Sequence, residues 1–260
     1  MPEGHTIHRA ARDQKPMLVG KRLSVTSPQG RFAEGAALLD GARCITIEAL
    51  GKHLLYHLDS ARVLHIHLGL AGRIYRDPLP AEPPREVVRV RLMSDSHVID
   101  ITGPAICEVL EAADLDAFRM RYGPDLLSAH PEPERAIQRI RASRSNIATL
   151  LMNQRVISGI GNIYRSEILW LLKLSPMTRG CDVPEPILER LWDEMRALME
   201  IGVRYNSIIT NGELPKAGQD VQERVNIYAQ ETCPRCRSPI TLSKLAQRSL
   251  YHCPKCQKAP

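Results

Sequence analysis

Cys233-Pro-Arg-Cys236 and Cys253-Pro-Lys-Cys256 are two Cys-x-x-Cys pairs near the end of the chain, and sixteen residues separate them. Each pair fits a tight turn, and two such turns can place four thiolates tetrahedrally around one Zn²⁺. The spacer, residues 237–252, has the length of a β-hairpin, and a hairpin this small has almost no core without the metal. Two redox-active pairs or unrelated cysteines are the alternatives. The spacing favours one structural zinc ion with Cys233, Cys236, Cys253 and Cys256 as its ligands.

The composition is that of a globular protein with a hydrophobic core, since 43% of the 260 residues are hydrophobic and 25% are charged. No apolar run approaches the roughly 18 residues of a membrane-spanning helix, and the N-terminus lacks an apolar signal region. We therefore expect a soluble cytoplasmic protein with no membrane partner. The net charge is +6, with +7 in residues 134–260 and −1 in residues 1–133. A basic half that also carries the cysteine pairs favours a polyanionic partner, most simply nucleic acid.

Short alternating segments in the first half predict a β-rich domain. After a predicted helix over residues 3–18, apolar residues recur at every second position between turns rich in Gly, Pro and Asp. These segments are residues 22–27, 44–51, 53–59, 62–70, 87–93 and 97–101. A proline-rich loop, residues 78–84, interrupts them. The pattern predicts an antiparallel β-sandwich or barrel with a flanking helix.

Apolar spacings of three and four predict that the second half is helical. The predicted helices lie near residues 134–142, 145–153, 162–173 and 185–205, and a polar loop over residues 206–219 follows them. We therefore expect an α+β protein with a β-sandwich domain, a helical domain and a zinc finger. Their predicted bounds are residues 1–127, 136–228 and 229–260, with a proline-containing linker at 128–135.

The turn Ser158-Gly159-Ile160-Gly161-Asn162 lies between two predicted helices. Its glycines allow a tight bend and a close approach of another backbone. Amides at the start of the following helix can hold a phosphate group. A plain corner between two helices is the alternative, and the turn by itself does not exclude it.

The run Asn153-Gln-Arg-Val-Ile-Ser-Gly-Ile-Gly-Asn-Ile-Tyr-Arg-Ser-Glu-Ile-Leu169 resembles the helix–two-turn–helix signature of the formamidopyrimidine-DNA glycosylase/endonuclease VIII family. Met1-Pro2-Glu3-Gly4 resembles the N-terminus of the endonuclease VIII branch, and the four-cysteine hairpin resembles the zinc finger of the family. The three motifs occur in the family's order along the whole chain. The resemblance implies an N-terminal antiparallel β-sandwich and a C-terminal helix–two-turn–helix domain with a zinc-finger hairpin.

The resemblance also implies a bifunctional DNA glycosylase and AP lyase of base excision repair, which removes oxidised bases and cuts the strand by β,δ-elimination. Pro2 would be the catalytic nucleophile after removal of Met1, because a secondary α-amine is less protonated at neutral pH than a lysine. Glu3 would be the general acid and base. The alternative is that Pro2 and Glu3 are simply a favourable helix start.

Four further residues match DNA-contacting positions of the family. Lys52 matches a strand lysine that neutralises a phosphate beside the lesion, and the family places it among the catalytic residues. Asn162 matches a phosphate contact in the turn, and Arg248 matches the zinc-finger arginine that clamps the phosphates at the tip of the hairpin. Leu70 matches an apolar side chain that fills the gap left by the extruded nucleotide.

The chain departs from the formamidopyrimidine branch at two places. Asp100-Ile-Thr-Gly-Pro-Ala105 stands where that branch has Asp-x-Arg-x-Phe-Gly, whose Arg and Phe complete the wedge, and Thr6 stands where it has a second glutamate. Both departures favour the endonuclease VIII-like branch and oxidised pyrimidines as substrates. A catalytically silent protein that binds damaged DNA is the main alternative. A zinc-dependent RNA-binding protein is disfavoured, because aromatic residues total only 4%.

The sequence also contains two histidine pairs. His65 and His67 share one face of a predicted strand, and we expect a structural or DNA-facing pair there rather than a metal site. His5 and His8 lie one helical turn apart near Glu3, and their spacing does not define a role. Taken with the motifs, the sequence predicts a monomeric bacterial protein that associates with the nucleoid and has damaged DNA as its partner.

Overall fold

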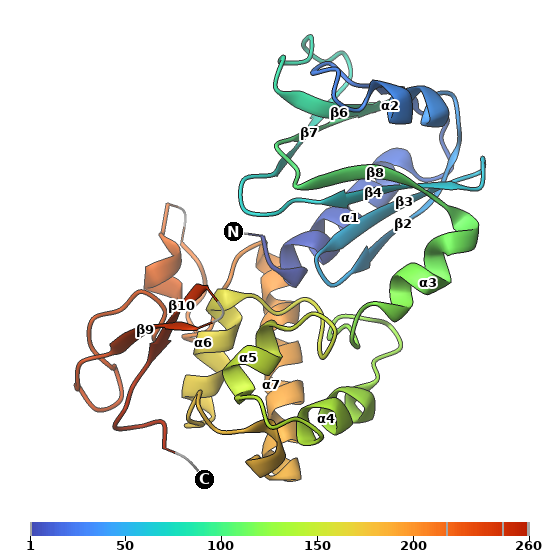
Figure 1. Ribbon diagram of the computed structural model, residues 1–260. Coiled ribbons are helices and arrows are strands. Elements are labelled where there is room, and N and C mark those ends of the chain that lie inside the picture. The colour runs from blue at the N-terminus through green and yellow to red at the C-terminus, as the bar shows by residue number, and fades with distance from the viewer. Residues whose placement is uncertain (1, 217, 246, 259–260) are drawn as a thin grey trace. The chain divides into compact units, whose positions relative to one another are not determined.

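Figure 1 shows the computed structural model, which describes residues 2–216, 218–245 and 247–258. The chain divides into two compact units. The first unit contains the residues up to Glu3 and Ile7–Met120, and the second contains Gly4–Thr6 and the chain from Arg121 onward. Among the described residues, no helix is long and apolar enough to cross a lipid bilayer.

The first unit is an antiparallel β-sandwich with helices at its sides, as the sequence predicts. One sheet has the strand order β1-β6-β7-β5, and the other has the order β2-β3-β4-β8. Its elements are α1 (Gly4–Leu18), β1 (Ser24–Thr26), α2 (Ala33–Leu39), β2 (Cys44–Leu50), β3 (His53–Leu58), β4 (Arg62–His67), β5 (Arg73–Pro78), β6 (Val88–Met93), β7 (His97–Thr102), β8 (Ile106–Glu111) and α3 (Leu115–Met120).

The core of this unit lies on one face of the β2-β3-β4-β8 sheet. Leu54 and Tyr56 on β3 and Leu64 and Ile66 on β4 are buried there, because alternate residues of a strand face the same side. The hydroxyl of Tyr56 donates a hydrogen bond of 2.7 Å to the side-chain oxygen of Gln14 on α1. The buried phenol is therefore satisfied by the helix that flanks the sheet.

The sequence did not predict two of the eight sandwich strands. β5 is an edge strand whose residues are mostly exposed on both faces, so its sequence lacks the alternation of a half-buried strand. β8 carries no fully buried residue, and its alternation is correspondingly weak. The predicted strand over residues 62–70 ends at His67, because the chain turns at Gly69, where φ is +65°.

The second unit is helical and ends in a two-stranded hairpin. Its elements are α4 (Pro133–Arg141), α5 (Ile147–Met152), α6 (Asn162–Leu171), α7 (Glu185–Tyr205), β9 (Thr241–Leu245) and β10 (Arg248–His252). The four predicted helices are therefore confirmed. The described part of the predicted loop over 206–219 contains no helix or strand, and residue 217 lies outside the described residues. α4 begins inside the segment 128–135, and the predicted domain bounds stay a prediction.

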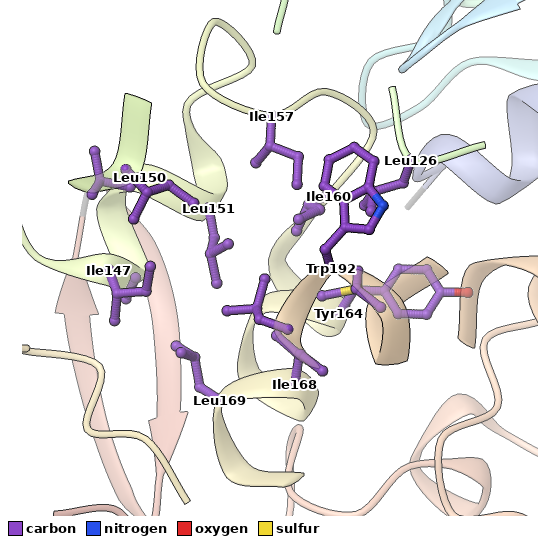
Figure 2. Close-up of a cluster of buried hydrophobic side chains, with 14 of the residues drawn as sticks. Leu126, Ile147, Leu150, Leu151, Ile157, Ile160, Tyr164, Ile168, Leu169 and Trp192 are labelled. Atoms are coloured by element: carbon purple, nitrogen blue, oxygen red, sulfur yellow. The ribbon is translucent and has the colours of Figure 1, made fainter. Parts of the chain in front are cut away.

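Apolar side chains from α4, α5, α6 and α7 form the core of the second unit. Figure 2 shows Ile147, Leu150 and Leu151 of α5 facing Ile168 and Leu169 of α6. The side chain of Asn146 caps α5 by accepting a hydrogen bond of 2.9 Å from the backbone N–H of Thr149. This packing fixes α6 and the turn before it, which together carry the family-like signature.

Candidate functional site

The four cysteines of the paired motifs come together at one point of the second unit. All four Sγ atoms lie within 4.8 Å of one another, with Cys233–Cys256 at 3.9 Å and Cys236–Cys253 at 3.4 Å. Tetrahedral Zn–S bonds of about 2.3 Å would require Sγ–Sγ distances of about 3.8 Å. The four side chains therefore fit one structural zinc ion, in agreement with the predicted ligands.

The zinc site packs against α6 through Trp170. The indole N–H of Trp170 lies 3.3 Å from the Sγ of Cys233, and the guanidinium of Arg235 stacks 4.0 Å from the centre of the indole ring. Arg235 also donates a hydrogen bond of 3.0 Å to the backbone carbonyl of Trp170. The metal turn is thereby attached to the helix that follows the glycine-rich turn.

The N-terminal motif precedes a helix start that the glycine-rich turn holds in place. The backbone N–H of Gly4 donates a hydrogen bond of 2.8 Å to the carbonyl of Gly159. A Cβ on Gly4 would lie 2.8 Å from the Cα of Gly159 and 2.7 Å from the Cε of Met199, so only glycine fits here. The close backbone approach that the sequence predicts at this turn is therefore confirmed, with the N-terminal segment as its partner.

Pro2 and Glu3 lie outside the helix that they precede. α1 begins at Gly4, Glu3 is its N-cap residue with extended backbone, and the Glu3 side chain makes no capping hydrogen bond. Glu3 is nevertheless completely buried. Burial of a carboxylate is costly in itself. An acidic N-cap residue also suits a helix start, so the roles of Pro2 and Glu3 stay a prediction.

Gln154 holds the glycine-rich turn in shape. Its side-chain oxygen accepts a hydrogen bond of 3.0 Å from the backbone N–H of Gly159, and its side-chain amide donates one of 3.0 Å to the carbonyl of Ile160. Gly159 itself has φ of +95°, where a residue with a Cβ would be strained. Gln154 belongs to the run that carries the family resemblance, but its spacing alone gives no sign of this role.

Asn162 and Arg165 connect α6 to the zinc-finger hairpin. The Asn162 side-chain amide donates a hydrogen bond of 2.8 Å to the backbone carbonyl of Ser249. Arg165 is fully buried, and its Nη2 donates to the side-chain oxygen of Asn162 and, at 3.1 Å, to the same Ser249 carbonyl. Arg165 was not predicted as a site residue, since its partner in the hairpin is more than eighty positions away in the sequence.

Arg248 directly precedes Ser249 and is the first residue of β10. Its side chain is exposed, and it pairs across the hairpin with Leu245 at the end of β9. Arg248 therefore lies at the tip of the hairpin, as predicted. Its contact with phosphates stays a prediction, as does that of Asn162, which is only 4% exposed.

Lys52 lies in the turn between β2 and β3, not inside a strand as expected. His53 begins β3, and His67 ends β4 directly opposite it in the sheet. Burial, together with the nearby His65, His67 and Lys52, lowers the pKa of His53 to about 3. Burial and the charge of Lys52 also lower the pKa of His67. The Lys52 ammonium therefore has neutral imidazoles beside it near pH 7.

Leu70 lies in the turn that follows β4, and it is 61% exposed. A large apolar side chain at this exposure gains little from the protein core. This position suits the predicted role of Leu70 as a wedge but does not test it.

The imidazole of His65 lies close to a carboxylate. Its Nδ1 lies 2.8 Å from a carboxylate oxygen of Glu108 on β8, a partner that sequence spacing does not indicate. Among the described residues, the four cysteines are the only group of three or more such side chains close enough to hold a metal ion. The interpretation of His65 and His67 as a structural or DNA-facing pair stays a prediction.

Three family models match the chain in order. Residues 1–104 match the formamidopyrimidine-DNA glycosylase N-terminal domain, residues 122–213 the formamidopyrimidine-DNA glycosylase H2TH domain, and residues 230–259 the zinc finger found in FPG and IleRS.

Similar proteins carry the names of both branches. Endonuclease 8 1 of Mycobacterium tuberculosis is 37% identical over 268 residues, which cover 99% of this chain and 100% of that protein. Endonuclease 8 of Pectobacterium atrosepticum is 33% identical, with 99% of this chain and 100% of that protein covered. Formamidopyrimidine-DNA glycosylase of Chloroflexus aurantiacus is also 33% identical, with 99% and 98% covered.

Solved structures share the fold. The crystal structure of the MutM (FPG) protein from Thermus thermophilus has a TM-score of 0.80 and 25% identity, and both chains are covered completely. A mutant of the Lactococcus lactis FPG, in complex with a Fapy-dG containing DNA, has a TM-score of 0.81 and 23% identity, with 99% of this chain and 100% of that chain covered.

Proposed function

Because the chain belongs to the formamidopyrimidine-DNA glycosylase/endonuclease VIII family, the DNA glycosylases of base excision repair, we propose that it is a bifunctional glycosylase and AP lyase whose nucleophile is Pro2. The observation that supports this most directly is the N-terminus. Pro2 and Glu3 directly precede α1, and Glu3 is buried at the N-cap position without a side-chain capping hydrogen bond. A buried carboxylate beside the chain terminus is typical of a site that serves chemistry.

The first step would be attack of the Pro2 nitrogen on C1′ of the damaged nucleotide. An α-amine titrates near pH 8, so roughly a tenth of it is unprotonated at neutral pH, against well under a hundredth of a lysine. A bond forms between nitrogen and C1′ while the bond from C1′ to the base breaks, and the departing base takes a proton. Glu3 is the acid that supplies protons to the sugar or base. Met1 must be removed first, because an acylated Pro2 nitrogen is not a nucleophile.

The lyase reaction would follow from an iminium ion. The nitrogen loses the proton that it carried as a secondary amine, the C1′–O4′ bond breaks, and O4′ takes a proton from Glu3, which leaves a C1′=N iminium on the opened sugar. Its positive charge acidifies C2′, and a base, for which we propose Glu3, removes a C2′ proton. The electron pair expels the 3′ phosphate in β-elimination, and a second proton loss expels the 5′ phosphate in δ-elimination. Water then hydrolyses the iminium and releases Pro2 as a secondary amine.

Binding of the strand would depend on residues of both units. Lys52 and Arg248 neutralise phosphates beside the lesion, Asn162 supports the same contacts, and Leu70 fills the gap in the duplex. The zinc ion supplies stability to the hairpin that carries Arg248 and takes no part in the chemistry. We propose damaged DNA as the partner of a monomeric enzyme.

Oxidised pyrimidines are the proposed substrates. Thr6 and the segment from Asp100 to Ala105 lack the glutamate and the Arg and Phe of the formamidopyrimidine branch. The Asp100 carboxylate accepts two hydrogen bonds of 2.7 Å from Arg91, so it is engaged within its own sheet. Without that Arg and Phe, the unpaired base opposite the extruded nucleotide would be contacted differently than in the formamidopyrimidine branch.

Borohydride trapping tests the proposal. The protein, with its processed N-terminus confirmed by mass, is incubated with abasic, oxidised-pyrimidine and oxidised-purine duplexes. We expect a covalent adduct and β,δ-elimination products with the abasic and oxidised-pyrimidine strands. Pro2→Gly should reduce trapping strongly and leave DNA affinity within about twofold, because glycine keeps an α-amine of lower nucleophilicity and removes no phosphate contact.

Failure to trap any of the three duplexes would instead favour the alternative of a catalytically silent protein that binds damaged DNA. Trapping of the oxidised purine alone would keep the mechanism and overturn the substrate preference. Binding and trapping are measured on the same protein, so the two outcomes are separable.

A further inference from the structure

A chain of hydrogen-bonded side chains runs across the β2-β3-β4-β8 sheet, on the face opposite its core. A carboxylate oxygen of Glu108 lies 2.8 Å from Nδ1 of His65, and Nε2 of His65 lies 2.8 Å from Nδ1 of His53. His53 and His65 are only 6% and 1% exposed. This series of hydrogen bonds begins at the half-exposed carboxylate of Glu108 and ends at His53, the residue that follows Lys52.

The register of the sheet explains how these residues meet. His65 lies opposite Glu108 on β8 and opposite Leu55 on β3, so His53 is its diagonal neighbour. Diagonal neighbours on one face are within reach of long or aromatic side chains. The ring of Phe118 on α3 covers both imidazoles edge-on, with centroid distances of 5.5 Å to His53 and 4.9 Å to His65. Each ring is therefore held in one orientation.

The carboxylate sets the direction of the hydrogen bonds. A carboxylate only accepts, so the proton of His65 is on Nδ1, and its Nε2 must accept from Nδ1–H of His53. This leaves Nε2 of His53 as the acceptor nitrogen of a neutral ring. Burial favours the neutral form of both imidazoles, as their lowered pKa values indicate. A neutral ring next to Lys52 does not repel the ammonium, whereas an imidazolium would displace it.

His67 lies beside His53 and contacts the turn that contains Leu70. The ring centroids of His53 and His67 are 4.9 Å apart. The backbone N–H of Gly69 donates a hydrogen bond of 3.2 Å to Nδ1 of His67, which requires that this nitrogen be unprotonated. Gly69 has φ of +65°, and a Cβ there would lie 2.7 Å from the Cβ of Ala105. The turn is therefore closely packed, and the His67 bond fixes the backbone directly before Leu70.

We propose that Glu108, His65 and His53 are positioning residues for Lys52, and that His67 is a positioning residue for the Leu70 turn. The proposal rests on the proposed function, because positioning these two side chains matters only if they contact DNA. Glu108, His65 and His53 would hold the turn of Lys52 where its ammonium contacts a phosphate. His67 would hold the turn of Leu70 where its side chain fills the space left by the extruded nucleotide.

The protonation pattern is the first test and needs no DNA. Long-range ¹H–¹⁵N spectra of the imidazole rings at pH 7 should show His53 and His65 protonated on Nδ1 and His67 on Nε2, all neutral. In Glu108→Ala, the preference of His65 for Nδ1–H should be lost. His53 or His65 found mainly as the Nε2–H form in the wild-type protein would overturn the proposal.

The second test measures affinity for a duplex with a tetrahydrofuran abasic-site analogue. Glu108→Ala should weaken binding about threefold and His65→Leu about tenfold, whereas Glu108→Gln, which keeps an acceptor oxygen, should recover most of the loss. In a Lys52→Ala background neither variant should weaken binding further, because the side chain that they position is gone. Additive losses in that background would show a merely structural effect and overturn the proposal.

His57 provides the matched control. It lies on the same strand and the same face, and its Nε2 is 2.9 Å from a carboxylate oxygen of Glu48, but it lies outside the chain that leads to Lys52. His57→Leu should therefore leave the affinity within about twofold. Glu108 is half exposed, so Glu108→Ala remains informative even if His65→Leu does not fold.

These results are distinct from the outcome of the trapping experiment. A protein that traps no DNA but shows the expected ring protonation and the Lys52-dependent losses would fail as a lyase and keep its positioning network. A protein that traps DNA with the opposite ring protonation would keep the proposed function and lose this inference.

Discussion

The side-chain amide of Asn162 donates a hydrogen bond of 2.8 Å to the backbone carbonyl of Ser249, the neighbour of Arg248. Asn162 is the first residue of α6, and Ser249 is part of β10. The helix that begins at the glycine-rich turn therefore holds the hairpin strand that carries the proposed phosphate clamp. Arg165 donates to the same carbonyl and completes the connection.

Asn162→Ala should weaken DNA binding through the hairpin. The variant removes one of the two donors to the Ser249 carbonyl, and loss of a partner from a polar group inside the protein costs about 1–3 kcal/mol. We expect about a tenfold loss of affinity for an abasic-site duplex, measured by fluorescence anisotropy. The control is Asn211→Ala, which removes a similar amide–carbonyl bond of 2.9 Å to Glu223 on the exposed surface of the same unit. Equal losses for both variants would contradict the prediction.

Arg248→Ala should weaken binding to all lesions by about the same factor. A phosphate contact carries no base information, so the ratio of affinities between duplexes should stay constant. The slope of log affinity against log salt should fall by about one, because one fewer counterion is released. A loss confined to one lesion would argue that Arg248 reads the base.

Removal of zinc should unfold the hairpin and abolish tight DNA binding. The four Sγ atoms lie within 4.8 Å of one another, and thiols at this distance need the metal to stay together. We expect one zinc ion per chain by metal analysis, and chelation should reduce DNA affinity by more than about tenfold. The helical signal of α4 to α7 should persist in circular dichroism, since their core is separate from the cysteines. Full DNA affinity after complete chelation would be the contrary result.

Glu167→Gln should destabilise the second unit. The buried carboxylate of Glu167 accepts hydrogen bonds of 2.8 Å from the backbone N–H groups of Asn226, Ile227 and Tyr228, and one of 2.6 Å from the hydroxyl of Thr210. An amide in its place would direct its own N–H groups at some of these donors. We expect a loss of about 2–4 kcal/mol in unfolding free energy by urea denaturation.

The same variant should increase hydrogen exchange at residues 226–228, which connect the helices to the zinc finger. Glu189→Gln, a change at an exposed residue of α7, is the control and should alter stability by less than about 0.5 kcal/mol. Unchanged exchange at 226–228 would mean that other contacts hold this segment.

Stability should fall as the pH is lowered from about 6.5, because His53 is neutral in the folded protein. Its pKa is about 3 when folded, against 6.5 for an exposed histidine, so the unfolded chain binds the proton first between these values. One such group contributes a slope of at most about 1.4 kcal/mol per pH unit, and His65 and His67 act in the same direction. His53→Phe should flatten the slope of unfolding free energy.

The effect of His53 on stability is best measured between pH 6.5 and 4.5, where Glu48 does not contribute to the slope. Burial would raise the pKa of the Glu48 carboxyl, but its hydrogen bonds to His57 and Arg119 outweigh this effect and lower the pKa from 4.5 to about 2. The contribution of Glu48 to stability is present above pH 4.5 and is lost only as the pH falls towards 2. An unchanged slope above pH 4.5 in His53→Phe would contradict the assignment of this effect to His53.

The sequence by itself determined the zinc ligands, the helices of the second unit and the family. Metal ligation and tight turns depend on residue types at short spacings, such as the paired cysteines and the glycines at 159 and 161, and these can be read directly along the chain. The sandwich was predicted from the alternation of apolar and polar residues. β5 was not predicted, because an edge strand exposed on both faces has no apolar side.

Only the tertiary structure decided which side chains serve as partners. Glu108 and His65 are 43 positions apart, Glu167 and Asn226 are 59 apart, and Asn162 and Ser249 are 87 apart. Such pairs are created by strand register and by the packing of helix against hairpin, which local spacing does not encode. Lys52 and Leu70 were predicted from short motifs along the chain, whereas the hydrogen bonds of His53 and His65 depend on strands that meet only in the folded sheet.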